Sequence, residues 1–227
     1  MSTNYPNDYD SYPTWQDLVD IIAAAIINNI QDAIVAIEHE LGKNPSGDYA
    51  TVRERLDDIK PGGRWSLVEE VDIESAVSSY TFSNLNGDDD KMYKVVARIV
   101  HGYSGWNHIG LRFNGDSGNN YGYQKFRSMG TGVTSEQVTS YNMAAVGRGN
   151  ESGGLILIDS LIYPVTGHCR QCMSHCYTTR SSCYPHFVIW LGSSWYNTTD
   201  NISSITIRSE YGNGLGVGTH LELWKRR

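Results

Sequence analysis

Four cysteines lie close together in the C-terminal half of this 227-residue chain. Cys169 and Cys172 form a C-x2-C turn, and Cys183 and His186 form a C-x2-H turn further along. Turns of this kind point two side chains into one volume, and four soft ligands in a tetrahedron are typical of structural Zn²⁺. The spacing therefore predicts a zinc site, with Cys176 as the alternative to His186.

The identity of the fourth ligand is open, because Cys176, His168 and His175 lie in the same segment. Two local disulfides are the main alternative, since the number of cysteines is even, and free thiols are the third. The N-terminus lacks the basic and apolar regions of a signal peptide, so we expect folding in a reducing cytosol, which favours zinc. Either role is structural, because a short loop poor in apolar residues needs a cross-link.

Two groups of acidic residues also offer ligands or catalytic carboxylates. The run 88–90 lacks the spacing and closing glutamate of an EF-hand loop, so we interpret it as a solvated hairpin turn rather than a Ca²⁺ site. One predicted strand carries acidic side chains in alternation, at Glu69, Glu70, Asp72 and Glu74. This pattern does not establish the distance between two catalytic carboxyl groups that a glycosidase requires. The chain also lacks nucleophile-elbow, zinc-protease, P-loop and dinucleotide motifs. We therefore expect no enzyme activity.

Tryptophan and tyrosine are abundant, with 6 and 15 copies. Their rings combine a flat apolar face with a polar edge, which suits stacking on sugars as well as packing in cores and subunit interfaces. Trp106, Trp190, Trp195 and Trp224 are therefore candidates for sugar stacking, and we expect most of them to lie in the core or in a subunit interface.

The charge and composition exclude some classes of partner. The chain carries 25 acidic and 18 basic residues, so no basic surface is expected for nucleic acid. No segment approaches the roughly 18 to 20 continuous apolar residues of a membrane span, so we expect no membrane insertion. Charged residues make up only 19%, below the usual share of about 25%. Together with the frequent glycine and tyrosine, this composition is typical of a turn-rich β domain.

The N-terminal quarter is predicted to be helical. Residues 1–13 are too polar and too short to fold, and we expect a flexible arm. Thr14 can cap a helix that continues without Gly or Pro until Gly42. After a turn, Asp48 can cap a second helix that contains Val52, Leu56 and Ile59. We therefore predict a helical trimerisation and attachment segment over 14–60.

The first helix carries a coiled-coil seam. Its apolar residues are spaced 4, 3, 4, 3, 4, at Ala23, Ile27, Ile30, Ile34, Ile37 and Leu41. Isoleucine at both core positions of the heptad favours three or four strands over two, so we predict a trimer. The alternative is an amphipathic helix packed on its own domain, since fewer than three full heptads are present.

Beyond a linker at 61–63, residues 64–227 contain short runs rich in Val, Ile, Thr and aromatic residues between glycine-bearing turns. Nine such runs are enough for two sheets: SLVEEVDI, SSYTF, MYKVVARIV, NHIGLRF, YGYQKF, GLILIDS, FVIWL, SSITIRS and THLELW. No long helical pattern separates them. The predicted fold class is therefore mainly β, a jelly-roll-like β-sandwich preceded by the α-helical segment, with a Cys-rich insertion at 165–186.

The segment INNIQDAIVAIEHELGKNPSGDYATVRERLDDI, residues 27–59, contains a helix that ends in E-x-E-L-G-x-N-P-x-G and leads into a T-V-x-x-R-L helix. It resembles a module of bacteriophage virion proteins, which include tail fibres, baseplate proteins and head-decorating fibres. In such proteins the module commonly lies near the N-terminus, and a receptor-facing or solvent-facing domain follows. The stretches GLRFNGDSGNNYGYQKF and GTHLELWKRR are also similar to the β-sandwiches that follow it.

The resemblance implies a structural component of a bacteriophage virion, assembled in the host cytoplasm. We expect a homotrimeric fibre-like or spike-like protein that attaches to other virion proteins through its N-terminal segment, as a host-facing tail fibre or baseplate protein. The first alternative is a capsid-decorating head fibre or cement protein. The second, suggested by the tryptophans, is a lectin or depolymerase domain with a host-surface glycan as its partner. The resemblance assigns no catalytic or ligand residue.

Overall fold

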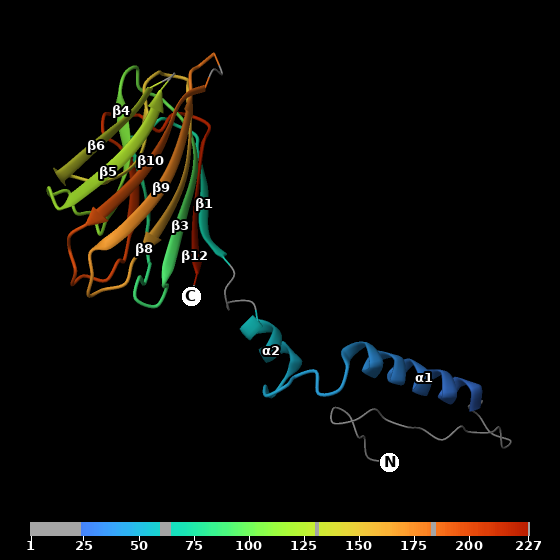
Figure 1. The fold of residues 1–227 in the computed structure, drawn as a ribbon. Coiled ribbons are helices and arrows are strands. Elements are labelled where there is room, and N and C mark those ends of the chain that lie inside the picture. Colours follow the sequence, from blue (N-terminus) through green and yellow to red (C-terminus); the bar gives the residue numbers. More distant parts are fainter. Residues whose placement is uncertain (1–23, 60–64, 130–131, 183–184, 227) are drawn as a thin grey trace. The chain divides into compact units, whose positions relative to one another are not determined.

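A computed structural model of the protein describes residues 24–59, 65–129, 132–182 and 185–226. The chain divides into two compact units, Met1–Gly62 and Gly63–Arg227, drawn in Figure 1. The predicted arm at 1–13, the cap Thr14, the seam residue Ala23 and the linker at 61–63 lie outside the described residues.

The first unit contains two helices, α1 (Ala24–Leu41) and α2 (Val52–Ile59). α1 ends at the predicted glycine: Gly42 has a φ of +78°, and its N–H donates to the Glu38 carbonyl over 2.9 Å. α2 is capped by Thr51, whereas the sequence suggested Asp48. The Glu54 N–H donates to the Thr51 hydroxyl over 3.1 Å, and the Thr51 N–H donates to the Glu54 carboxylate over 3.2 Å. This reciprocal pair is a capping box.

The turn between α1 and α2 is stabilised by residues of the N-P-x-G pattern. Asn44 and Gly47 have positive φ angles of 48° and 61°, and the Gly47 N–H donates to the Asn44 carbonyl over 2.9 Å. The Arg55 guanidinium of α2 donates to the Pro45 carbonyl over 2.7 Å. The N-P-x-G turn and the arginine of the second helix therefore form one local connection.

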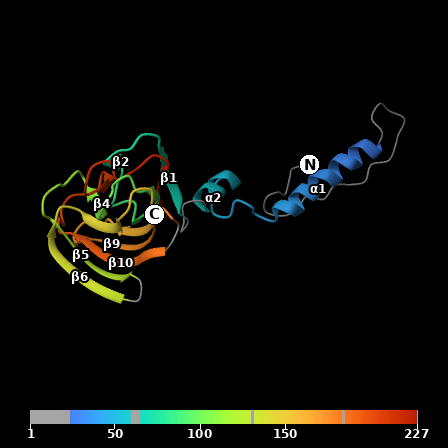
Figure 2. The same cartoon turned by 90° about the horizontal axis from the view of Figure 1, so that it is seen from above.

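The second unit is a β-sandwich of two antiparallel sheets, seen as two layers in Figure 2. The larger sheet has the strand order β1-β12-β3-β8-β9-β10-β5-β6, and the smaller has the order β2-β11-β4-β7. The strands are β1 (Ser66–Ile73), β2 (Ser79–Phe82), β3 (Met92–Val100), β4 (Asn107–Phe113), β5 (Tyr121–Met129), β6 (Gly132–Tyr141), β7 (Ala144–Gly149), β8 (Leu155–Tyr163), β9 (Arg170–Thr179), β10 (Pro185–Trp195), β11 (Ile205–Ser209) and β12 (Thr219–Arg226). The predicted mainly β fold class is confirmed.

Strand β9 corrects one prediction. The Cys-rich segment 165–186 is not an insertion outside the sheets, because β9 pairs with β8 on one side and with β10 on the other. Its inward-facing residues include Cys172, Ser174, Cys176 and Thr178, which are all buried. Small thiols and hydroxyls fill the space that β-branched residues occupy in other strands, so the sequence of β9 shows no apolar alternation.

The core lies between the two sheets. Along β3 the buried residues alternate, at Tyr93, Val95, Ala97 and Ile99, and face the smaller sheet. At one end of the sandwich Trp195 stacks on Tyr121 with ring centroids 6.3 Å apart and donates its indole N–H to Asp116 over 2.7 Å. Because side chains alternate between the two faces of a strand, every second side chain of the larger sheet lies on the outer surface of that sheet.

Candidate functional site

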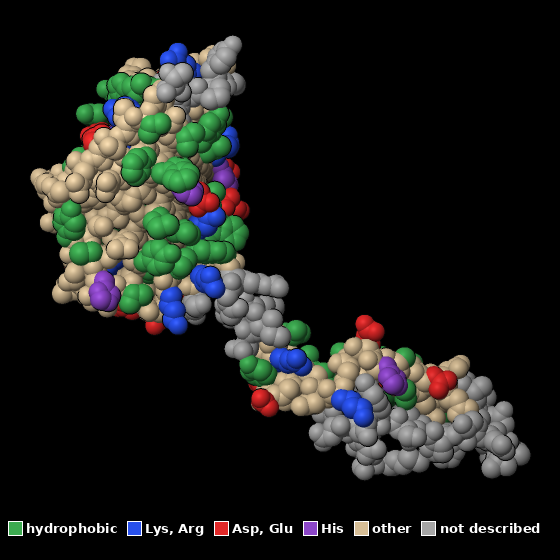
Figure 3. All heavy atoms as spheres, viewed as in Figure 1, with side chains coloured by type: hydrophobic (Ala, Val, Ile, Leu, Met, Phe, Trp, Pro, Cys, Tyr) green, Lys and Arg blue, Asp and Glu red, His purple; other side chains and the backbone are tan. Residues whose placement is uncertain are grey.

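The outer face of the larger sheet carries a row of aromatic side chains, and Figure 3 shows hydrophobic side chains gathered over this face. Strand register places Phe126 of β5, Trp190 of β10 and His175 of β9 side by side. Phe126 and Trp190 are 57% and 62% exposed. The His175 ring lies 5.2 Å from the Trp190 ring. Two large apolar rings and one imidazole therefore form an open platform across three neighbouring strands.

An apolar groove of about 510 Å³ lies beside this aromatic row, over β3, β8, β9, β10 and β12. Its walls include Leu157, Tyr177 and Val188, which strand register places in one row on the outer face. Asp159 lines the same groove and pairs with Lys94 over 2.8 Å. The groove thus combines apolar walls with charges at its margin, as small-molecule sites commonly do.

The far margin of the groove is formed by a small ionic cluster. The two ring nitrogens of His220 lie 2.9 Å from Asp72 and 3.1 Å from Glu222. The pKa of His220 is raised by these hydrogen bonds to Asp72 and Glu222. Trp224 donates its indole N–H to Glu222 over 2.6 Å. This tryptophan is therefore held by the cluster and is not a free platform like Trp190.

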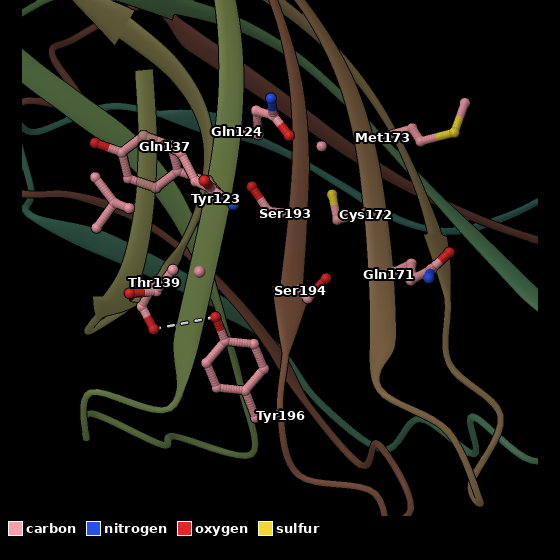
Figure 4. Close-up of a pocket in the computed structure, with 13 residues that line it drawn as sticks. Tyr123, Gln124, Gln137, Thr139, Gln171, Cys172, Met173, Ser193, Ser194 and Tyr196 are labelled. Carbon is pink, nitrogen blue, oxygen red and sulfur yellow. Dashed lines mark hydrogen bonds between the residues drawn. The ribbon is translucent and has the colours of Figure 1, made fainter.

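A second hollow, of about 340 Å³, lies on the other side of the aromatic row and is drawn in Figure 4. Three glutamines line it, Gln124, Gln137 and Gln171, and come from β5, β6 and β9. Gln124 and Gln137 are register partners, and Ser194 of β10 adds a hydroxyl. Amides and hydroxyls both donate and accept hydrogen bonds, which matches the hydroxyl groups of sugars.

Two glycines shape the floor of this hollow. A Cβ at Gly192 would meet no atom within 4 Å, so the backbone of β10 is open there between Gln124 and Met173. A Cβ at Gly122 would clash with the hydroxyl of Tyr196. Tyr196 donates to the Thr139 carbonyl over 3.1 Å, the bond dashed in Figure 4. The tyrosine is thus fixed over glycine at one end of the hollow.

The predicted zinc ligands are distributed differently. Cys172 and Cys176 are buried on the inward face of β9, whereas Cys169 precedes the strand and is exposed. Side chains four residues apart on a strand are about 13 Å apart, so Cys172 and Cys176 cannot bind one metal ion together. Cys183 and the side chain of His186 lie outside the described residues. Within the described ranges, no group of three or more His, Cys, Asp or Glu side chains could hold a metal.

Burial makes two of these thiols unreactive. It raises the pKa of Cys172 to about 11 and that of Cys176 to about 12, so both stay protonated at neutral pH. We therefore expect a thiol reagent to modify Cys169 rapidly in the folded protein, and Cys172 and Cys176 only after unfolding, as peptide mass spectrometry would show. Rapid labelling of all three would contradict this placement.

Zinc itself is tested by elemental analysis of protein purified without chelator. About one zinc per chain, with the Cys183 thiol becoming reactive after chelation, would support a site. Protein that contains no metal and has oxidised cysteines would replace the zinc prediction with a disulfide.

The acidic run 88–90 lies in a turn in which Asp88 and Asp89 are exposed, as predicted, but two of its carboxylates also have a structural role. Asp90 is buried, accepts a hydrogen bond from the Tyr93 hydroxyl over 3.0 Å and pairs with Lys225 over 3.2 Å. Asp88 accepts the Thr166 N–H over 2.8 Å. These carboxylates therefore tie loops to strands at one end of the sandwich.

Comparisons with known proteins give no family for this chain. No protein-family model matches it, and no curated protein matches it. None of the helices in the described part of the chain is long and apolar enough to cross a membrane. The geometry of the outer face is thus the main structural guide to function.

Proposed function

We propose that the chain is a trimeric structural protein of a bacteriophage virion, a tail fibre or baseplate component whose jelly-roll-like head binds a host-surface glycan. The observation that carries the glycan is the outer face of the larger sheet, where Trp190 and Phe126 lie between an apolar groove and a glutamine-lined hollow. Sugar rings have apolar faces and polar edges, so a saccharide can stack on the platform and bond to the amides. The head acts by binding, without a catalytic step.

The exposed stripe on α1 supports self-association. Four residues of the predicted seam, Ile30, Ile34, Ile37 and Leu41, are between 38% and 59% exposed in the single chain. A helix rarely leaves such a continuous apolar stripe in water, and heptad spacing favours a second and third copy of the same helix as its cover. Three heads on one stalk would bind a repetitive glycan with high avidity even when each single contact is weak.

Capsid decoration is a second candidate, because the module that residues 27–59 resemble also occurs in head-decorating fibres. In that case the helical segment would attach to capsomers and the outer face would point to solvent. Cryo-electron microscopy of the particle separates the two: density at the tail supports the first assignment, and density on the capsid supports the second.

Substitution of the central tryptophan tests the glycan assignment. Trp190→Ala is expected to weaken binding of host-surface polysaccharide at least tenfold, because truncating an exposed aromatic anchor removes most of its stacking surface. A glycan array identifies the saccharide, and calorimetry on the full chain measures the affinity. The side chain is 62% exposed, so the fold should be unaffected, which circular dichroism checks.

Tyr211→Ala is the matched control, because Tyr211 is 49% exposed but lines neither hollow of the outer face. Its affinity should equal that of the wild type. Equal losses in both variants, or none in Trp190→Ala, would remove the outer face from the proposal. Hydrolysis of the bound glycan would instead identify a depolymerase.

A further inference from the structure

The inward face of β5 and the neighbouring β7 carry a second cluster of aromatic and charged side chains, apart from the outer face. Trp106, just before β4, lies against two guanidinium groups. The Arg148 guanidinium is 4.2 Å from the ring centroid and that of Arg127 is 5.6 Å from it. The indole is still 38% exposed. Two arginines from different sheets therefore converge on one accessible ring.

These two guanidiniums have no acceptor in the described part of the chain. No side-chain hydrogen bond or ion pair reaches Arg127 or Arg148 there, and the Nε atoms of both are buried without a partner. Burial, and next the charge of Arg127, lower the pKa of Arg148. The charges of Glu136 and Glu210 act in the opposite direction, but neither carboxylate forms an ion pair with either guanidinium. Among the described residues, the two arginines therefore lack a directly bound anion.

The nearby carboxylates are already paired. Glu136 lies 2.6 Å from the Lys125 ammonium and accepts the Tyr123 hydroxyl over 3.0 Å. Glu210 lies 3.1 Å from Nδ1 of His108. Both acidic groups are thus committed to partners other than the two arginines.

His108 adds no positive charge to this cluster. Its Nε2 lies 3.4 Å from the Lys125 ammonium, which can only donate, so Nε2 accepts and Nδ1 carries the proton. Burial, followed by the charges of Lys125 and Arg148, lowers the pKa of His108 to about 4. The imidazole is therefore neutral at pH 7. The cluster holds three positive charges, on Lys125, Arg127 and Arg148, and two negative charges, on Glu136 and Glu210. One positive charge is left uncompensated, in a chain of net charge −7.

We propose that Trp106, Arg127 and Arg148 form an oxyanion-binding site for the carboxylate, sulfate or phosphate of an acidic sugar. Guanidinium forks match the oxygens of such groups and can bind them in two places at once. The indole holds both guanidiniums through cation–π contacts and is 38% exposed beside them, so the sugar that carries the anion can contact it. The site lies on the other face of β5 from Phe126, so it is independent of the glycan platform proposed above.

Calorimetry and NMR on the full chain at low salt test this site, with sodium glucuronate, inorganic phosphate and neutral glucose as probes. Glucuronate is expected to bind, to shift the indole N–H signal of Trp106, and to bind more weakly as salt is raised. Trp106→Phe assigns that signal. Phosphate that binds as well as glucuronate would support the site and assign it to the free anion. Glucuronate that binds no better than glucose would overturn it.

Substitution of each arginine is the second test of this site. Arg127→Gln and Arg148→Gln are each expected to weaken glucuronate binding at least tenfold, while Arg180→Gln, an exposed arginine at the end of β9, should leave it unchanged. Without ligand, Arg127→Gln should keep or raise the melting temperature, because a like-charge contact is removed. Unchanged glucuronate affinity in both glutamine variants, or a lowered melting temperature with binding intact, would show that the pair is only structural.

Discussion

The double substitution Ile30→Asp with Ile34→Asp is expected to convert a trimer of the full chain into monomers. Both side chains lie on the exposed seam of α1. In a three-helix interface they would form adjacent core layers, and each layer would then hold three carboxylates away from water. Burying charges without partners costs several kcal/mol for each group, more than a short coiled coil can offset. Light scattering at micromolar concentration should show the mass fall from three times 25.3 kDa to a single chain.

A control with the same added charge uses Asn29→Asp with Ala36→Asp, two exposed positions of α1 outside the 4-3 seam. This variant should stay trimeric, because its carboxylates face water. A wild-type chain that is monomeric at micromolar concentration would contradict the seam, and a dimer or tetramer would keep the seam but change the number of strands.

The helix end and nine of the strands were predictable because their signals are local. Gly42 ends α1 since only a residue tolerant of positive φ fits there, and β3 shows apolar residues at every second position. β6 is not predicted, because this edge strand is exposed along almost its whole length and the apolar residues that pack against the core, Val138 and Tyr141, lie near its end. β9 was missed because its buried positions hold thiols and hydroxyls, which in a sequence resemble a metal motif.

The candidate sites were less predictable, because they depend on register between distant segments. Trp190 and Trp195 lie five residues apart on β10, so a strand must place them on opposite faces, but the pattern does not say which one is inside. The structure buries Trp195 and exposes Trp190 beside Phe126. Likewise, Trp106, Arg127 and Arg148 meet only through the packing of β5 against β7, which no local pattern describes.

The central position of β9 has a measurable consequence at Arg170, its first residue. This side chain is fully buried, and its guanidinium donates to four backbone carbonyls, those of Pro164, His168, Asn197 and Asp200. It also lies 5.4 Å from the ring of the core residue Trp195. One guanidinium therefore donates hydrogen bonds to backbone carbonyls of the loop before β9 and of the loop after β10, and it also packs on the core.

Arg170→Met is consequently expected to lower the free energy of unfolding by about 3 to 5 kcal/mol, because the carbonyls lose their donors in a site that water reaches poorly. Urea unfolding followed by tryptophan fluorescence measures this. The whole sandwich should unfold together at lower urea, since Arg170 contacts the same core as β5 and β10. Arg180→Met, at the exposed end of the same segment, should change the free energy by less than about 0.5 kcal/mol. A loss below about 1 kcal/mol in Arg170→Met, or a separate early transition confined to residues 165–186, would instead restore the Cys-rich segment as an independent appendage of the sandwich.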